Sequence, residues 1–171
     1  ANMLFVDGGN DRIGVGTNAP TSELSVVGTG TFTKTNNAAN IILKTTDTDA
    51  NEGPVLKLSR DVVGAADDVI GTIQYYGQDV AGNDTHYVEL ETIIKDATDG
   101  SEDGRFNLTV AKAGVLVGVL NADMSLGEVV INEGSKDINF RVESDNDTHA
   151  FFINGADGNI GMSISDPASH I

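Results

Sequence analysis

The sequence predicts an all-β protein, and three observations lead to that prediction. Apolar and polar residues alternate with a period of two in five short central runs, a pattern typical of strands with one buried face. Clusters of Gly, Asn and Asp separate these runs and have the chemistry of tight turns. No segment combines helix caps with an apolar period of about 3.6 residues. We therefore expect a β-rich chain whose central part is an antiparallel meander or a small sandwich.

The two ends of the chain repeat each other. Residues 5–20 align without a gap on residues 152–167, with Phe, Gly, Ile, Gly and Pro at matching positions. Each copy reads as a short apolar strand, a turn rich in Gly, Asn and Asp, a second strand and a proline at the exit. A hairpin of this size buries too little apolar surface to be stable alone. Each copy is therefore expected to pack against a neighbouring segment or a neighbouring chain.

The centre of the chain contains the strands of the expected meander. A bridge rich in Thr and Asn, residues 29–49, precedes them and has its apolar residues clustered at 41–43. The alternating runs predict five strands, at residues 54–60, 69–75, 86–94, 106–110 and 115–119.

The C-terminal part offers three more short apolar runs, at residues 128–131, 138–142 and 150–153. The last of them leads into the second copy of the repeat. We accordingly divide the chain into an N-terminal hairpin module (1–30), a central β domain (31–121) and a C-terminal β module (122–171).

The charge and composition exclude several classes of protein. Ten Lys and Arg against 26 Asp and Glu give a net charge of −16, which opposes binding to nucleic acid and to anionic membranes. No apolar run approaches the roughly 20 residues of a membrane span. The chain has no Cys, which excludes a disulfide scaffold and thiol chemistry. We expect neither a nucleic-acid partner nor membrane insertion.

The motifs that suggest enzymatic chemistry lack their structural context. Residues 14–19 match a dinucleotide-binding glycine motif, but Pro20 and a strand-like run follow where a helix should open. Glu89 and Glu91 lie on one strand face about 7 Å apart, a separation used by inverting glycosidases. Any Glu-x-Glu strand offers that spacing, and a solvated face is far more common. The chain is therefore predicted not to be an enzyme and to need no cofactor.

Four aspartates are candidates for a bound calcium ion. Asp47 and Asp49 occupy the first ligand positions of a calcium loop, but the Gly at position six and the Glu at position twelve are missing. Asp99 and Asp103 belong to an acidic stretch that could also bind a hard cation. The competing interpretation is that these carboxylates cap turns and keep the protein soluble.

The same acidic stretch, residues 96–104, is the candidate contact with a receptor. It contains four carboxylates and two glycines with a single small apolar side chain, so it cannot be buried without leaving charges unpaired. Asp99, Glu102 and Asp103 are the residues expected to make the contact. A solvated connector with no partner is the more common role of such loops.

Several segments of the chain together resemble a known family. Residues 4–26 are similar to a module that recurs along phage tail fibres and tail spikes, notably those of marine phages. Residues 129–145 and the central segments 54–60, 70–77 and 96–104 resemble these fibres too. The second copy of the module departs from the family pattern, with Met-Ser-Ile at residues 162–164 where Val-Gly-Thr is usual.

The resemblance implies an intertwined homotrimeric fibre, located in the virion and outside the cell, that serves structure and host attachment. Its implied partners are other copies of the chain, other fibre or tail proteins, and a host surface receptor or glycan. Such fibres often precede an autocleaving intramolecular chaperone, which no part of this chain resembles. The alternatives are an extracellular bacterial adhesin or a carbohydrate-binding module, and then a glycan depolymerase. Six Phe, three Tyr and no Trp offer few platforms for sugar stacking.

Overall fold

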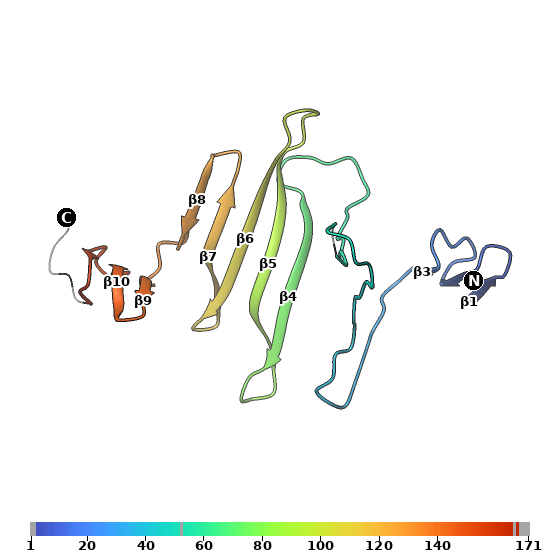
Figure 1. Ribbon diagram of the computed structural model, residues 1–171, viewed down its shortest axis with the longest axis horizontal. Helices are drawn as coiled ribbons and strands as arrows, with labels where there is room; N and C mark the ends of the chain where they lie inside the picture. Colours follow the sequence, from blue (N-terminus) through green and yellow to red (C-terminus); the bar gives the residue numbers. More distant parts are fainter. Residues whose placement is uncertain (1–2, 52, 166, 168–171) are drawn as a thin grey trace. The chain divides into compact units, whose positions relative to one another are not determined.

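A computed structural model describes residues 3–51, 53–165 and 167. The chain divides into two compact units, Ala1–Leu56 and Lys57–Ile171. All regular structure in the described residues is β, with eleven strands in three sheets (Figure 1). The described part of the chain has no helix long and apolar enough to cross a membrane. The all-β fold and the central antiparallel meander are therefore confirmed.

The first unit contains the N-terminal copy of the repeat. Its strands are β1 (Leu4–Asp7), β2 (Arg12–Val15) and β3 (Leu24–Val26). β1 and β2 form an antiparallel hairpin with Phe5 opposite Gly14. β3 returns to pair in parallel with β2, with Leu24 opposite Ile13. The predicted hairpin is thus present, and a third strand covers one of its edges.

The second unit contains a five-stranded antiparallel meander. Its strands are β4 (Val69–Gln78), β5 (Asp84–Asp96), β6 (Asp103–Lys112), β7 (Val115–Asp123) and β8 (Glu128–Ile131). Each strand pairs with its neighbours in sequence, so that β4 and β8 form the edges (Figure 1). Ala113 and Gly114 join β6 to β7 with φ values of 51° and 79°, the two positive angles that a tight hairpin turn requires.

The prediction of a strand at residues 54–60 is wrong. The fifth strand of the meander is β8 instead. The alternating pattern of that segment is real, but a strand also needs a neighbour with which to share backbone hydrogen bonds. No described strand pairs with it. Leu58 packs on the sheet at Gly71 instead, where an added Cβ would lie 3.0 Å from the Leu58 Cβ. The sheet in turn extends past residue 121 as far as Ile131.

The C-terminal copy of the repeat forms the third sheet. Its strands are β9 (Phe140–Ser144), β10 (Asp147–Ile153) and β11 (Ile160–Gly161), with β10 in the centre. β10 pairs with β11 so that Phe152 lies opposite Gly161. The first copy places Phe5 opposite Gly14 in the same register. The sequence repeat is therefore also a repeat of strand pairing.

Both copies place left-handed backbone at the same two positions. Asp11 and its counterpart Gly158 have φ values of 54° and 74°. Gly16 and its counterpart Ser163 have φ values of 72° and 56°. Ser163 therefore keeps the turn geometry of the first copy, although only glycine adopts such angles without strain. Each copy has one glycine and one larger residue at these positions, in opposite order.

The exit of each copy is held by a hydrogen bond to the carbonyl oxygen of its proline. Arg12 donates from Nη1 to the oxygen of Pro20 at 3.0 Å. Asn159 occupies the same position in the second copy and donates from Nδ2 to the oxygen of Pro167 at 2.9 Å. Both prolines are buried. Arginine and asparagine thus make equivalent hydrogen bonds to the proline oxygen. The geometry at the exit is therefore the same in both copies although the donor residue differs.

The apolar core is small. Apart from the two prolines, only Ile93, Val117 and Phe152 are buried apolar side chains among the described residues. Ile93 and Val117 belong to the meander, and Phe152 lies edge-on to the ring of His149 at 5.1 Å. None of the described large side chains is completely shielded from solvent. Each sheet is consequently a single layer with little covering its apolar side chains.

Replacement of Gly14 tests whether the turn of the first copy depends on the close approach of the Thr17 backbone to this glycine. A Cβ at Gly14 would lie 2.4 Å from the carbonyl oxygen of Thr17, so we expect Gly14→Ala to destabilise β1–β3 by about 1–3 kcal/mol. Gly8→Ala is the matched control because its Cβ would have no atom within 4 Å. Hydrogen–deuterium exchange of the β1–β3 amides checks the difference. Equal protection in the two variants would contradict the described turn.

Candidate functional site

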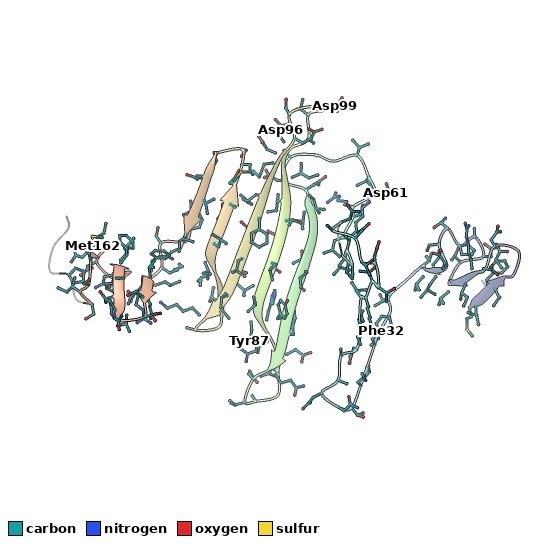
Figure 2. All side chains as sticks on the ribbon, in the orientation of Figure 1. Phe32, Asp61, Tyr87, Asp96, Asp99 and Met162 are labelled. Carbon is teal, nitrogen blue, oxygen red and sulfur yellow. The ribbon has the colours of Figure 1, made fainter. Side chains whose placement is uncertain are left out.

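The acidic loop lies where the sequence placed it, between two long strands. β5 ends at Asp96 and β6 begins at Asp103, so the loop itself is residues 97–102. All six loop residues are exposed, and Asp103 is half-buried at the start of β6. Figure 2 shows Asp96 and Asp99 at one end of the five-stranded sheet and Tyr87 towards the other. The exposure agrees with the sequence analysis, while the receptor role of Asp99, Glu102 and Asp103 stays a prediction.

Two of the carboxylates hold the shape of the loop. Asp96 accepts a hydrogen bond from the backbone N–H of Thr98 at 2.8 Å. Glu102 accepts one from the N–H of Gly100 at 3.2 Å, and Gly100 itself has a φ of 80°. Hydrogen bonds from the hydroxyl and the N–H of Thr98 keep the pKa of Asp96 below its usual value. The loop therefore has a defined geometry.

A hollow of about 430 Å³ lies at the base of the loop. Ile70, Ile94 and Ala97 contribute apolar atoms to its lining. Asp96 and its neighbours Glu102 and Asp103 add three carboxylate side chains to the same lining. An apolar surface beside carboxylates suits a cationic group carried on an aliphatic stem, because the stem and the charge each meet a matching surface.

A second loop, residues 64–68, is pinned beside the same end of β5. Asp67 donates its N–H to the oxygen of Ile94 at 2.8 Å, and the N–H of Ile94 donates to the oxygen of Asp68 at 2.9 Å. Lys95 forms an ion pair with Asp67, whose pKa is lowered by that hydrogen bond and charge. Sequence reasoning missed this pairing because the partners are far apart in the chain.

The four calcium candidates are divided between the two units. Asp47 and Asp49 belong to the first unit, and Asp99 and Asp103 belong to the second. Both carboxylate oxygens of Asp49 accept hydrogen bonds from Asn51, at 3.0 and 2.6 Å. Among the residues that the structure describes, no group of three or more His, Asp or Glu side chains is arranged to hold a metal ion. Calcium binding therefore stays a prediction without a complete site.

The polar face of the meander carries a network of amides and carboxylates. The side chain of Asn121 donates to Asn107 at 2.8 Å, and Asn107 donates to Glu91 at 3.2 Å. Gln74 donates to Glu89 at 2.8 Å. The two glutamates that matched a glycosidase spacing are thus acceptors for side-chain amides of neighbouring strands. The sequence signal for this network was only the polar alternation of the strands.

His86 is half-buried on β5. The ring of His86 stacks on that of Tyr76 with centroids 4.6 Å apart and an interplanar angle of 9°. Its Nε2 lies 3.7 Å from a carboxylate oxygen of Glu89. These contacts give His86 a packing role on β5.

Acid should destabilise the protein, because six aspartates have pKa values lowered from the ordinary 3.8 by hydrogen-bond donors. A folded pKa below the unfolded one means that the unfolded chain binds more protons in acid. These aspartates therefore stabilise the folded protein fully at pH values above their unfolded pKa of 3.8. Their contribution is lost as the pH falls through the lowered pKa values of the folded protein. Thermal melting near pH 5 and near pH 3 should give a lower Tm at the acid end.

A control variant separates this effect from general charge repulsion. Asp123 is buried and accepts hydrogen bonds at Oδ1 from the hydroxyl and the N–H of Ser125. Asp123→Asn keeps an oxygen for Ser125 but no longer titrates there, so the difference in Tm between the two pH values should shrink. A Tm that rises in acid would mean that relief of repulsion among the 26 acidic residues dominates instead.

Comparison with known proteins assigns the chain to no family. No protein-family model matches the sequence, and no curated protein matches it either. The resemblance of the two end modules to phage fibres therefore stays a prediction.

Proposed function

We propose that this chain is a structural segment of an extracellular viral fibre or tail spike that works as a homotrimer and supports attachment to a host cell. The observation that carries the proposal is the small core. Three buried aliphatic or aromatic side chains among the described residues are few for a chain of 171 residues, which would normally bury about 70% of its unfolded surface. The missing burial is readily supplied by other copies of the chain.

The repeated end modules support a fibre. Both copies use the same strand register and the same left-handed positions. Modules repeated along a chain build extended proteins in which each unit contacts mainly its neighbours. The net charge of −16 adds to this, because it keeps a large extracellular assembly soluble.

The acidic loop and the hollow at its base are the proposed contact with a receptor. The hollow combines the apolar side chains of Ile70 and Ile94 with the carboxylates of Asp96, Glu102 and Asp103. The receptor group that fits this chemistry is a cation on an aliphatic stem, such as a lysine side chain or an aminoalkyl substituent. A trimer presents the loop three times, so weak individual contacts add through multivalency.

A carbohydrate-binding module or an adhesin is the second candidate, and one observation favours it. All three tyrosines of the chain are exposed and lie in β4 and β5. Tyr75 and Tyr76 are in β4, and the ring of Tyr87 in β5 lies over Gly77, where an added Cβ would be 3.2 Å from it. Exposed aromatic rings can stack on sugars, so binding of neutral glycans by a monomer would favour this candidate over the fibre.

The mass of the protein in solution tests the proposed assembly. Sedimentation equilibrium at micromolar concentration should give three times the chain mass of 17.8 kDa. Far-UV circular dichroism of the same sample should show β-structure. A folded monomer that does not associate at this concentration would overturn the homotrimer.

Attachment is tested by removing the carboxylates of the loop. The triple variant Asp99→Ser, Glu102→Ser and Asp103→Ser should compete less well than the unaltered protein for adsorption of the parent particle to its host. The matched control changes three exposed aspartates elsewhere, Asp47, Asp49 and Asp61, to Ser and so changes the net charge equally. Equal competition by the two variants would remove the loop from the receptor contact and leave it a connector.

A further inference from the structure

The five-stranded meander has one apolar face, and a single row of side chains crosses it from edge to edge. Ile73 pairs with Leu90, Leu90 with Leu108, Leu108 with Leu120, and Leu120 with Ile131. Paired residues of adjacent strands point to the same side of a sheet. These five residues are called the aliphatic row. They form a continuous apolar band across β4 to β8.

The opposite face is polar at the neighbouring positions. The adjacent register row consists of Thr72, Glu91, Asn107, Asn121 and Val130, which are paired across the same five strands. Its amides already bond to one another and to Glu91. The two faces of the sheet therefore differ in kind: one carries a network of amides and a carboxylate, and the aliphatic row on the other carries no polar side chain.

The aliphatic row is incompletely covered within its own unit. Ile73 and Ile131, at its two ends, have exposed fractions of 40% and 46%. Leu90, Leu108 and Leu120, in its middle, are only half-buried although they lie on interior strands. The contact of Leu58 with Gly71 covers one place beside the row, on the β4 edge. A sheet face with an exposed apolar band is stabilised when a further layer of protein packs on it.

The area of the apolar face fits an interface between proteins. The five strands, of four to thirteen residues, lie about 4.8 Å apart and rise about 3.4 Å per residue, so that together they give a face of roughly 750 Å². Apolar patches on ordinary monomers reach only about 300–600 Å². A stable interface buries about 800 Å² on each partner, which is close to the size of this face.

Charge selects this face for a contact between copies of the chain. Each copy carries a net charge of −16, so copies can approach closely only through a surface without charges. The polar face would bring Glu89 and Glu91 against their counterparts, whereas the aliphatic row brings no ionisable group. Because the aliphatic row is uncharged, the row of one copy can pack against the row of another without any need for opposite charges.

We propose that the aliphatic row is the core of the contact between copies of this chain, with the polar face turned outwards. This inference rests on the homotrimer proposed above and adds the face through which it forms. Three sheets then turn the row towards a common axis. Leu108 lies nearest that axis, because β6 is the central strand of the five.

Single cysteines test the proposal cleanly, because the chain contains no other thiol. Ile73→Cys lies in the row, and Gln74→Cys is its neighbour on the polar face of β4. Val129→Cys and Glu128→Cys form the same kind of pair on β8, with Val129 opposite Ala122 on the apolar side. All four positions are exposed in the single chain. A maleimide reagent added to the native assembly should label Gln74→Cys and Glu128→Cys readily, and should largely fail to label the other two.

The mass of each unlabelled variant separates the possible outcomes. A trimer in which Ile73→Cys and Val129→Cys label as fast as their partners would overturn the face assignment and leave the homotrimer standing. A monomer would overturn both proposals, and if its row is nevertheless protected, this chain's own residues cover the face. Protection that appears only in the trimer and disappears on dissociation is the expected result.

A second pair of variants reports on the centre of the sheet. Leu108→Lys places a charge in the row, and Thr109→Lys places the same charge on the polar face, opposite Glu89. The first should reduce the mass to that of one chain, and the second should leave it unchanged. If Leu108→Lys does not fold, the thiol labelling still decides, because it uses exposed positions at the edges. A trimeric Leu108→Lys protein would contradict the proposal.

Discussion

The register of the β-ladder is the constraint on which the second unit depends. Pairing of β4 through β8 aligns five apolar side chains on one face and a polar row on the other. A shift of a single residue would exchange the two faces of a strand. The tight turn at Ala113 and Gly114 holds β6 against β7, and register shifts near Tyr75 and Leu108 adjust the pairing further along. The polar network and the aliphatic row are both products of this alignment.

The two end modules show which features of a short repeat carry its fold. Phe and Gly face each other in both, but the left-handed positions exchange their glycine, and the donor to the proline oxygen changes from Arg12 to Asn159. Gly14 and Gly161 are kept because in each case an added Cβ would run into a carbonyl oxygen three residues on. Backbone geometry is therefore more constant than side-chain chemistry. A module of this kind tolerates changes in surface residues while the turn stays the same.

Sequence reasoning found the parts of this fold that depend on local information. Alternation identified β4 to β7, and turn residues identified the hairpins, because both signals lie within a few residues. The segment 54–60 has the same alternation but no described partner strand, and pairing is not a local property. The acidic loop could be predicted from its composition. The ion pair of Lys95 with Asp67 and the contact of Asn121 with Asn107 could not, since they depend on register between distant segments.

The number of strands also constrains how copies of the sheet can meet. In an antiparallel meander of five strands, the edge strands β4 and β8 run in the same direction. Copies related by an axis along the strands would therefore bring β8 of one against β4 of the next in parallel, the mode that β2 and β3 already use in the first unit. β8 has only four residues, and short edge strands resist uncontrolled pairing, whereas β4 has ten. An interface built on the faces thus leaves most of the long β4 edge without a strand partner, while Leu58 packs against the same strand at Gly71.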